Sequence, residues 1–152
     1  MTPVIRRATP DDAGALTRIA HAARSHRGYP DAWIGDWRDA LTLTPGYIPA
    51  HEVFAAANDD GPRGFYALSP RGETAVVDHL WIEPAWMGRG PGRALLEHAM
   101  DTARALGATR MEIDSDPHAE AFYRRMGARR IGVVPAGVEG VARVLPRMEI
   151  NH

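Results

Sequence analysis

The sequence predicts a single α/β (α+β) domain over residues 1–152, with a mixed, mostly antiparallel sheet of about seven strands and helices on both faces. The length of 152 residues is that of one domain. Hydrophobic residues make up 45% of the chain and charged residues 24%, which is typical of a folded, water-soluble domain. Strand-like and helix-like segments follow one another in the order β-α-α-β-β-β-α-β-α-β-β. One helical crossover should therefore place a parallel pair of strands inside an otherwise antiparallel sheet.

The N-terminal segment is expected to form a strand at 4–8 and a helix at 10–26. Thr9 and Asp12 have the spacing of a helix capping box. Pro10 suits the first helical position, because the N–H group that proline lacks has no partner there in any case.

A second helix is expected over 31–41, after a Gly-Tyr-Pro break at 28–30. Trp33 and Trp37 lie one helical turn apart on one side of it. Both tryptophans could line an acceptor pocket together with Tyr29. Alternatively, the tryptophans pack the helix on the sheet. Both interpretations remain open.

Three strands in the middle of the chain are expected to form an antiparallel meander. They cover 52–57, 64–68 and 76–82, and an Asn-Asp-Asp-Gly-Pro turn at 58–62 joins the first two. The stretch 44–50 contains two prolines and is expected to be a loop.

The remaining elements follow from helix stop signals and β-branched runs. They are a helix that ends at Gly107, a strand at 111–114, a helix from about Asp116 to Gly127, and two strands at 131–134 and 142–150. The strand at 111–114 follows a helix, so it should run parallel to the strand at 76–82.

The stretch between the strand at 76–82 and the next helix has the features of an anion-binding helix start. Gly88, Gly90 and Gly92 alternate with Arg89 and Pro91. Glycine lets the backbone curl, so that several N–H groups converge on a phosphate at the positive end of the helix dipole. Proline disfavours helix at the residue before it, so Gly90 is expected at the N-cap and Pro91 at N1.

The backbone N–H groups expected to face a ligand are those of Gly88, Arg89, Gly90, Gly92 and Arg93, with the arginine side chains as outer clamps. The spacing is neither the G-x-G-x-x-G of a dinucleotide fold nor a P-loop, and the chain contains no lysine. An ordinary tight turn between strand and helix is the alternative interpretation.

The glycine string resembles the acyl-CoA loop of the GNAT acetyltransferase superfamily, whose pattern is Gln/Arg-x-x-Gly-x-Gly/Ala. The pattern falls on residues 87–92, and Met87 stands where the family often has Gln or Arg.

A second stretch, D-P-H-A-E-A-F-Y-R-R-M-G-A at 116–128, is similar to the other GNAT signature. Phe122, Tyr123 and the Met-Gly pair before Ala128 match it, whereas His118 stands where Asn is usual and Ala128 replaces Phe. The two stretches lie in the family's order and spacing, and the expected elements cover essentially the whole chain.

The resemblance implies an acetyl-CoA-dependent N-acetyltransferase that acts on a primary amine by direct attack in a ternary complex. The pantetheine arm is expected to pair with backbone near Trp81 and Ile82. The expected cosubstrate-binding residues are Trp81, Ile82, Met87, Gly88, Arg89, Gly90, Gly92, Arg93, His118 and Phe122.

Tyr123 matches the family's general acid, since a phenol of pKa about 10 can protonate a thiolate whose thiol has a pKa of about 8.5. Asp78 stands where some members of the family carry the general base, and it is preferred here over His79 and Glu83. Asp78 and His79 are expected on opposite faces of the sheet, because side chains alternate along a strand.

Several other kinds of protein fit the sequence less well. The chain has no cysteine, which excludes disulfides and thiolate chemistry, and its histidines lack metal-ligand spacing, so no metal is expected. A net charge of −1 argues against a nucleic-acid or anionic-membrane partner. No apolar run of signal-peptide or membrane-span length is apparent, so a cytoplasmic location is expected.

The acceptor, a small molecule or a peptide, is left open by the sequence. Residues 24–52 and 135–142 are expected to shape its site, and a homodimer would place the last strands at an interface. A non-catalytic acyl-CoA-binding or regulatory domain and a nucleotide-binding domain are the alternative functions.

Overall fold

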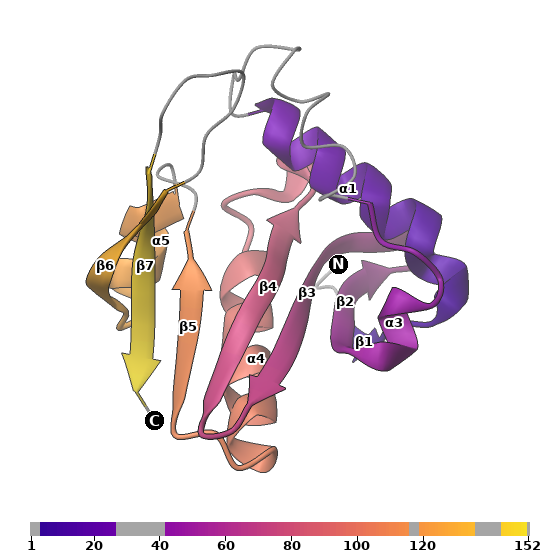
Figure 1. Cartoon of the computed structure of the whole chain (residues 1–152). Helices are drawn as coiled ribbons and strands as arrows, with labels where there is room; N and C mark the ends of the chain where they lie inside the picture. Colours follow the sequence, from indigo (N-terminus) through magenta and orange to yellow (C-terminus); the bar gives the residue numbers. More distant parts are fainter. Residues whose placement is uncertain (1–3, 27–41, 116–118, 136–143, 152) are drawn as a thin grey trace.

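A single seven-stranded sheet runs through the computed structural model, which describes residues 4–26, 42–115, 119–135 and 144–151 (Figure 1). The strands are β1 (Val4–Arg7), β2 (Glu52–Asn58), β3 (Gly61–Arg71), β4 (Thr74–Ile82), β5 (Arg110–Asp114), β6 (Arg129–Pro135) and β7 (Val144–Asn151). The helices are α1 (Ala13–His26), α3 (Tyr47–Ala50), α4 (Pro91–Ala105) and α5 (Glu120–Arg125), with 3-10 turns η1 (Pro10–Asp12) and η2 (Pro84–Trp86).

The order of the strands across the sheet is β1-β2-β3-β4-β5-β7-β6. β4 and β5 are parallel, and every other neighbouring pair is antiparallel. This confirms the predicted meander of β2, β3 and β4 and the single parallel pair. The parallel pair is made by α4, which carries the chain from β4 back to β5.

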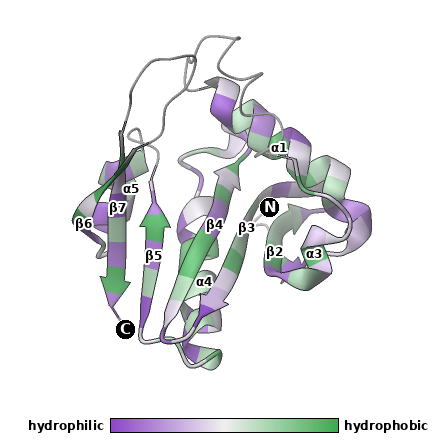
Figure 2. Cartoon of the chain, viewed as in Figure 1, coloured by the Kyte–Doolittle hydropathy of each residue, from purple (hydrophilic) through white to green (hydrophobic). Residues whose placement is uncertain are grey.

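Helices cover both faces of the sheet, as predicted. α1 crosses one face and α4 and α5 lie on the other (Figure 1). Leu95 and Leu96 of α4 are fully buried in one hydrophobic cluster, and Leu16 of α1 is fully buried in a second cluster on the opposite face. Hydropathy alternates along β7, where Met148 and Ile150 face the α4 cluster (Figure 2). None of the helices that the structure describes is long and apolar enough to cross a membrane.

Local chemistry sets the helix ends. The Thr9 N–H group donates to the Asp12 carboxylate at 2.8 Å, which is one half of the predicted capping box. Gly90 is the N-cap of α4 with Pro91 at N1, and Gly107 follows α4 with φ 89°. Each of these three predictions is confirmed.

The prediction of a loop over 44–50 is wrong for the second half of this stretch, which forms α3. The Tyr47 N–H group donates to both the carbonyl and the hydroxyl oxygen of Thr44 at 3.1 Å, which closes a turn that continues as a short helix. The predicted helix at 31–41 and the N-cap at Asp116 lie outside the described residues.

β4 contains a bulge that changes the direction of its side chains. Across the β3–β4 pair, Val77 and His79 have Cα partners in β3, and Asp78 between them is the extra residue. The Tyr47 hydroxyl approaches Asp78 at 3.4 Å and the Tyr47 ring lies 6.0 Å from that of His79. Asp78 and His79 therefore share the α1 face of the sheet. The expectation that they point to opposite faces is wrong, because the bulge breaks the alternation.

β4 also extends further along the sheet than its parallel partner β5. The pairing with β5 ends at Val77 and Ile113, while β4 continues to Ile82. Beyond Val77 the backbone of β4 thus has no described β5 residue beside it.

We predict that Gly64→Ala destabilises the fold. A Cβ at Gly64 would lie 2.7 Å from Ile82 Cδ1, 3.0 Å from the Trp81 carbonyl oxygen and 3.2 Å from Leu95 Cδ1. Overpacking of this kind costs about 1–3 kcal/mol, measurable by urea unfolding. Gly132→Ala is the matched control, because a Cβ there meets nothing within 4 Å. Equal stability of the two variants would contradict the packing described for β3, β4 and α4.

Candidate functional site

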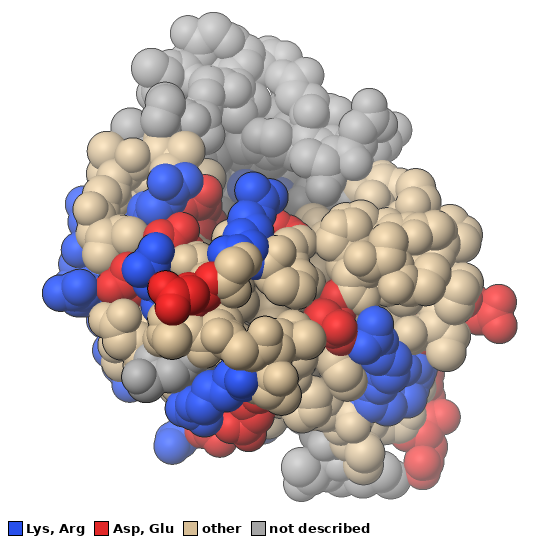
Figure 3. Space-filling view, turned by 60° about the horizontal axis from the view of Figure 1, so that its bottom comes forward, with Lys and Arg blue, Asp and Glu red and all other residues tan. Residues whose placement is uncertain are grey.

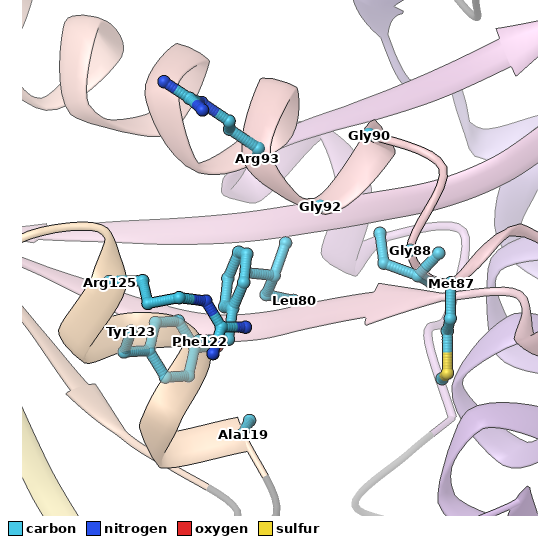
Figure 4. A pocket seen from close by; sticks show the side chains of 11 residues that line it. Leu80, Met87, Gly88, Gly90, Gly92, Arg93, Ala119, Phe122, Tyr123 and Arg125 are labelled. Carbon is cyan, nitrogen blue, oxygen red and sulfur yellow. The ribbon is translucent and has the colours of Figure 1, made fainter.

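A cavity of about 620 Å³ opens where β4 leaves β5, on the α4 face of the sheet (Figure 4). Its walls come from the end of β4, the glycine loop with the first turn of α4, and α5. The lining residues are Leu80, Ile82, Met87, Gly88, Gly90, Gly92, Arg93, Ala119, Phe122, Tyr123 and Arg125.

The glycine loop owes its course to two residues in left-handed backbone conformations. Gly88 has φ 76° and Gly90 has φ 99°, a region where other residues are strained. The first hydrogen bond of α4 joins the Ala94 N–H group to the Gly90 carbonyl at 3.1 Å. The amides of Gly92 and Arg93 therefore precede the helical ladder, at the positive end of the helix dipole. This arrangement can bind an anion.

Arg89 departs from the expected set of amide donors. Its N–H group donates to the Trp86 carbonyl at 3.2 Å, and its guanidinium lies 5.6 Å from the centre of the Trp86 ring. The expectation that this amide faces a ligand is wrong in this conformation, because the turn after η2 already uses it.

α5 contributes the aromatic wall of the cavity. Tyr123 is 5% exposed and lies edge-on to Phe122, with ring centroids 5.3 Å apart. The helix ends at Gly127, with φ 97°, in a Schellman motif: the Ala128 N–H group donates to the Tyr123 carbonyl at 2.9 Å. This end structure fixes the backbone of Tyr123. Phe122 also reaches α4, since its ring lies 3.6 Å from where a Cβ of Gly92 would be.

A polar cluster lies on the α1 face, beside the same end of β4. The Asp78 carboxylate accepts hydrogen bonds from the Tyr47 and Ser69 hydroxyls. Burial, reinforced by this carboxylate, raises the pKa of Tyr47. The phenol therefore stays protonated and acts as a donor to Asp78.

His79 belongs to the same cluster but already uses one ring nitrogen. Its Nδ1 accepts a hydrogen bond from Trp81 Nε1 at 3.1 Å, so the proton of the neutral ring is on Nε2. Burial lowers the pKa of His79, against the opposing effect of Asp78. At neutral pH the ring is thus uncharged, with its Nδ1 lone pair engaged.

The structure divides the predicted residues between the two faces. Eight of the predicted site residues come together in the cavity, namely Ile82, Met87, Gly88, Gly90, Gly92, Arg93, Phe122 and Tyr123. Trp81 does not, because its side chain is 9% exposed within the α1-side cluster, so it can serve the cavity only through its backbone. Glu83 pairs with Arg63 at 2.9 Å. Four of the predicted site residues lie outside the described residues, namely Tyr29, Trp33, Trp37 and His118.

Three lining residues were missed by the sequence reasoning, namely Leu80, Ala119 and Arg125. Helical spacing could have found Arg125, which lies one turn after Phe122. Leu80 shares its face with Ile82 by strand alternation.

Charges of both signs are interspersed over the face shown in Figure 3. Many of them are paired in the structure; Arg147 with Asp114 and Arg129 with Glu149 are examples. Within the described ranges, no group of three or more His, Cys, Asp or Glu residues is placed to hold a metal ion.

Comparison with known proteins agrees with this geometry. Residues 16–128 match the Acetyltransferase (GNAT) family model. The chain is 32% identical over 131 residues to the N-alpha-acetyltransferase RimI of Mycobacterium tuberculosis, covering 82% of each chain. It is 31% identical over 130 residues to the peptidyl-lysine N-acetyltransferase YjaB of Escherichia coli, covering 84% of this chain and 83% of that one.

A solved structure shares the fold. The PaiA N-acetyltransferase from Thermoplasma acidophilum, in complex with coenzyme A, superposes with a TM-score of 0.78 at 18% identity and 100% coverage of both chains. The family match spans most of the chain and includes both glycine loop and α5. This chain therefore belongs to the GNAT family of acetyltransferases.

Proposed function

We propose that this enzyme transfers the acetyl group of acetyl-CoA to a primary amine, by direct attack in a ternary complex. One observation carries the proposal: a single cavity joins the amides at the start of α4 to Tyr123, at the point where β4 separates from β5. These features would align a bound diphosphate, an extended arm along the edge of β4 and the phenol of Tyr123.

The chain's own groups suit each part of acetyl-CoA, which is the acyl donor in this proposal. The amides of Gly90, Gly92 and Arg93 would hold the diphosphate. The edge of β4 at Leu80 and Ile82, which no described residue of β5 pairs with, would take the pantetheine arm in the manner of an added strand. A backbone N–H group on this edge would also stabilise negative charge on the thioester oxygen.

Tyr123 is assigned as the general acid that protonates the leaving thiolate. Its side chain is almost completely buried, yet it lines the cavity, so a proton it donates would go to a group bound there. The absence of cysteine from the chain removes a covalent thioester route through a protein thiol.

Asp78 is assigned as the proton acceptor for the amine. It is exposed and held by two hydroxyl donors, whereas the Nδ1 lone pair of His79 is engaged by Trp81. Since Asp78 lies on the α1 face and Tyr123 on the α4 face, the amine would approach from the α1 side and attack through the gap between β4 and β5.

The two relatives named above are an N-alpha-acetyltransferase and a peptidyl-lysine N-acetyltransferase, which makes a peptide amine the first acceptor to test. The test of function is release of the CoA thiol from acetyl-CoA over peptides, amino acids, aminoglycosides and simple amines. Binding of acetyl-CoA without thiol release on any amine would instead indicate a non-catalytic acyl-CoA-binding domain.

We predict that Tyr123→Phe lowers kcat about 100-fold or more while leaving the Kd for acetyl-CoA nearly unchanged, because only proton donation to the thiolate is lost. Steady-state thiol release and calorimetric titration measure the two quantities. Tyr66→Phe is the matched control, since Tyr66 is a buried phenol outside the cavity that bonds to His98 and Thr102. An unchanged kcat in Tyr123→Phe would remove Tyr123 from the mechanism.

We predict that Asp78→Asn changes the acidic limb of the pH dependence of kcat/KM. A base acts in its deprotonated form, so the rate falls as the pH drops and the base takes up a proton. Replacing the carboxylate by an amide should lower the rate and displace this limb. Asp59→Asn, in the exposed β2–β3 turn, should leave the profile as it is. A profile that keeps its acidic limb in Asp78→Asn would reject Asp78 as the base.

A further inference from the structure

We propose that Arg63, a residue of β3 outside the cavity, positions the glycine loop for diphosphate binding by holding Trp86 in place. Neither Arg63 nor Trp86 is among the residues that line the cavity. This inference rests on the proposed function, because it assigns a positioning role in the binding of acetyl-CoA.

The glycine loop begins with a tight turn that starts at Trp86. The Arg89 N–H group donates to the Trp86 carbonyl at 3.2 Å, and between them Met87 has φ −61° and ψ 138° and Gly88 has φ 76°. These angles are those of a type II turn, which requires a positive φ at its third residue. The hydrogen bond of the turn does not use the Gly88 N–H group, and Gly88 lines the cavity. The direction of this amide is therefore set by a turn whose first residue is Trp86.

Arg63 joins the β2–β3 hairpin to the segment that carries Trp86. Its carbonyl accepts a hydrogen bond from the Glu83 N–H group at 2.8 Å, and its Nη1 donates to Glu83 Oε2 at 2.9 Å. Its Nε donates to Asn58 Oδ1, in the hairpin, at 3.3 Å. Glu83 comes directly before η2, and its carbonyl accepts from the Trp86 N–H group at 2.8 Å. The Arg63 side chain is thus fixed at two points beside the start of the loop.

The Arg63 guanidinium also contacts the Trp86 ring. Its central carbon lies 5.9 Å from the centre of the ring, within the range of a cation–π contact, and the Arg63 side chain is only 20% exposed. Arg89 places a second guanidinium 5.6 Å from the same ring. Trp86 is therefore held both by the hairpin and by the loop. A loop that is held in its binding conformation beforehand loses less conformational freedom when the ligand binds.

Attraction of the diphosphate by the charge of Arg63 is the competing explanation, and Glu83 distinguishes the two. Glu83 neutralises Arg63 and also fixes its side chain. Removal of the Glu83 carboxylate leaves a more positive surface, which would tighten anion binding if charge alone mattered. In the positioning role the same change frees Arg63 from its anchor and weakens binding.

The test measures the Kd for acetyl-CoA by calorimetry and kcat by thiol release at saturating acetyl-CoA. We expect Arg63→Gln and Glu83→Ala each to raise the Kd about tenfold, as a tenfold smaller fraction of molecules with the loop in its binding conformation would require. In Arg63→Gln the kcat should stay within about twofold, because Tyr123 and Asp78 are unchanged. Arg71→Gln, at the other end of β3, removes the same charge and should leave the Kd as it is.

Substitutions of Trp86 test the ring itself. Trp86→Leu should raise the Kd about as much as Arg63→Gln does, whereas Trp86→Phe keeps an aromatic face and should retain most of the affinity. Since Arg63 acts through Trp86 in this proposal, the double variant Arg63→Gln/Trp86→Leu should bind about as weakly as either single variant.

The positioning role is overturned if Arg63→Gln binds acetyl-CoA as tightly as the unmodified enzyme, if Glu83→Ala binds it more tightly, or if the two effects add in the double variant. Should Arg63→Gln fail to fold, equal affinities of Trp86→Leu and Trp86→Phe would overturn the role instead. Acetyl transfer by the unmodified enzyme alongside any of these results leaves the proposed function standing, whereas failure of the unmodified chain to bind acetyl-CoA contradicts both.

Discussion

The site depends on the point at which β4 loses β5 as a neighbour. The parallel pair holds from Thr74 to Val77, and the next residue, Asp78, is the extra residue of a bulge against β3. A bulge increases the local twist of a strand and redirects its side chains. Here its position coincides with the end of the β5 pairing. Two consequences follow. Beyond Val77 the edge of β4 pairs with no described residue of β5, which is where the proposal places the extended ligand. Asp78 and His79 are turned to the face opposite the cavity.

In the proposed mechanism, the sheet separates the group that protonates the thiolate from the group that deprotonates the amine. The proposed acid, Tyr123, sits on the α4 face, held by the Schellman end of α5. The proposed base, Asp78, sits on the α1 face, held by the hydroxyls of Tyr47 and Ser69. In the proposed mechanism, the acyl donor on one face and the amine on the other would meet in the gap between β4 and β5.

Much of the fold could be predicted because its signals are local. Gly90 with Pro91, and Gly107 and Gly127 after their helices, mark boundaries through backbone conformations that only nearby residues decide. The bulge at Asp78 could not be predicted, since nothing in the strand itself tells which residue will lack a partner in β3. The role of the Arg89 amide was missed for a similar reason: its acceptor, the Trp86 carbonyl, depends on the turn made by η2. Strand pairing over a long range determines where the bulge lies, and turn geometry determines the acceptor of the Arg89 amide. The periodicity of hydrophobic residues predicts neither.

The most direct measurement is a crystal structure of the enzyme with acetyl-CoA bound. The account predicts the diphosphate on the amides at the start of α4, the pantetheine arm along the edge of β4 beyond Val77, and the thioester sulfur facing the Tyr123 hydroxyl. A complex in which acetyl-CoA occupies another surface, or in which the Tyr123 hydroxyl points away from the sulfur, would contradict the account.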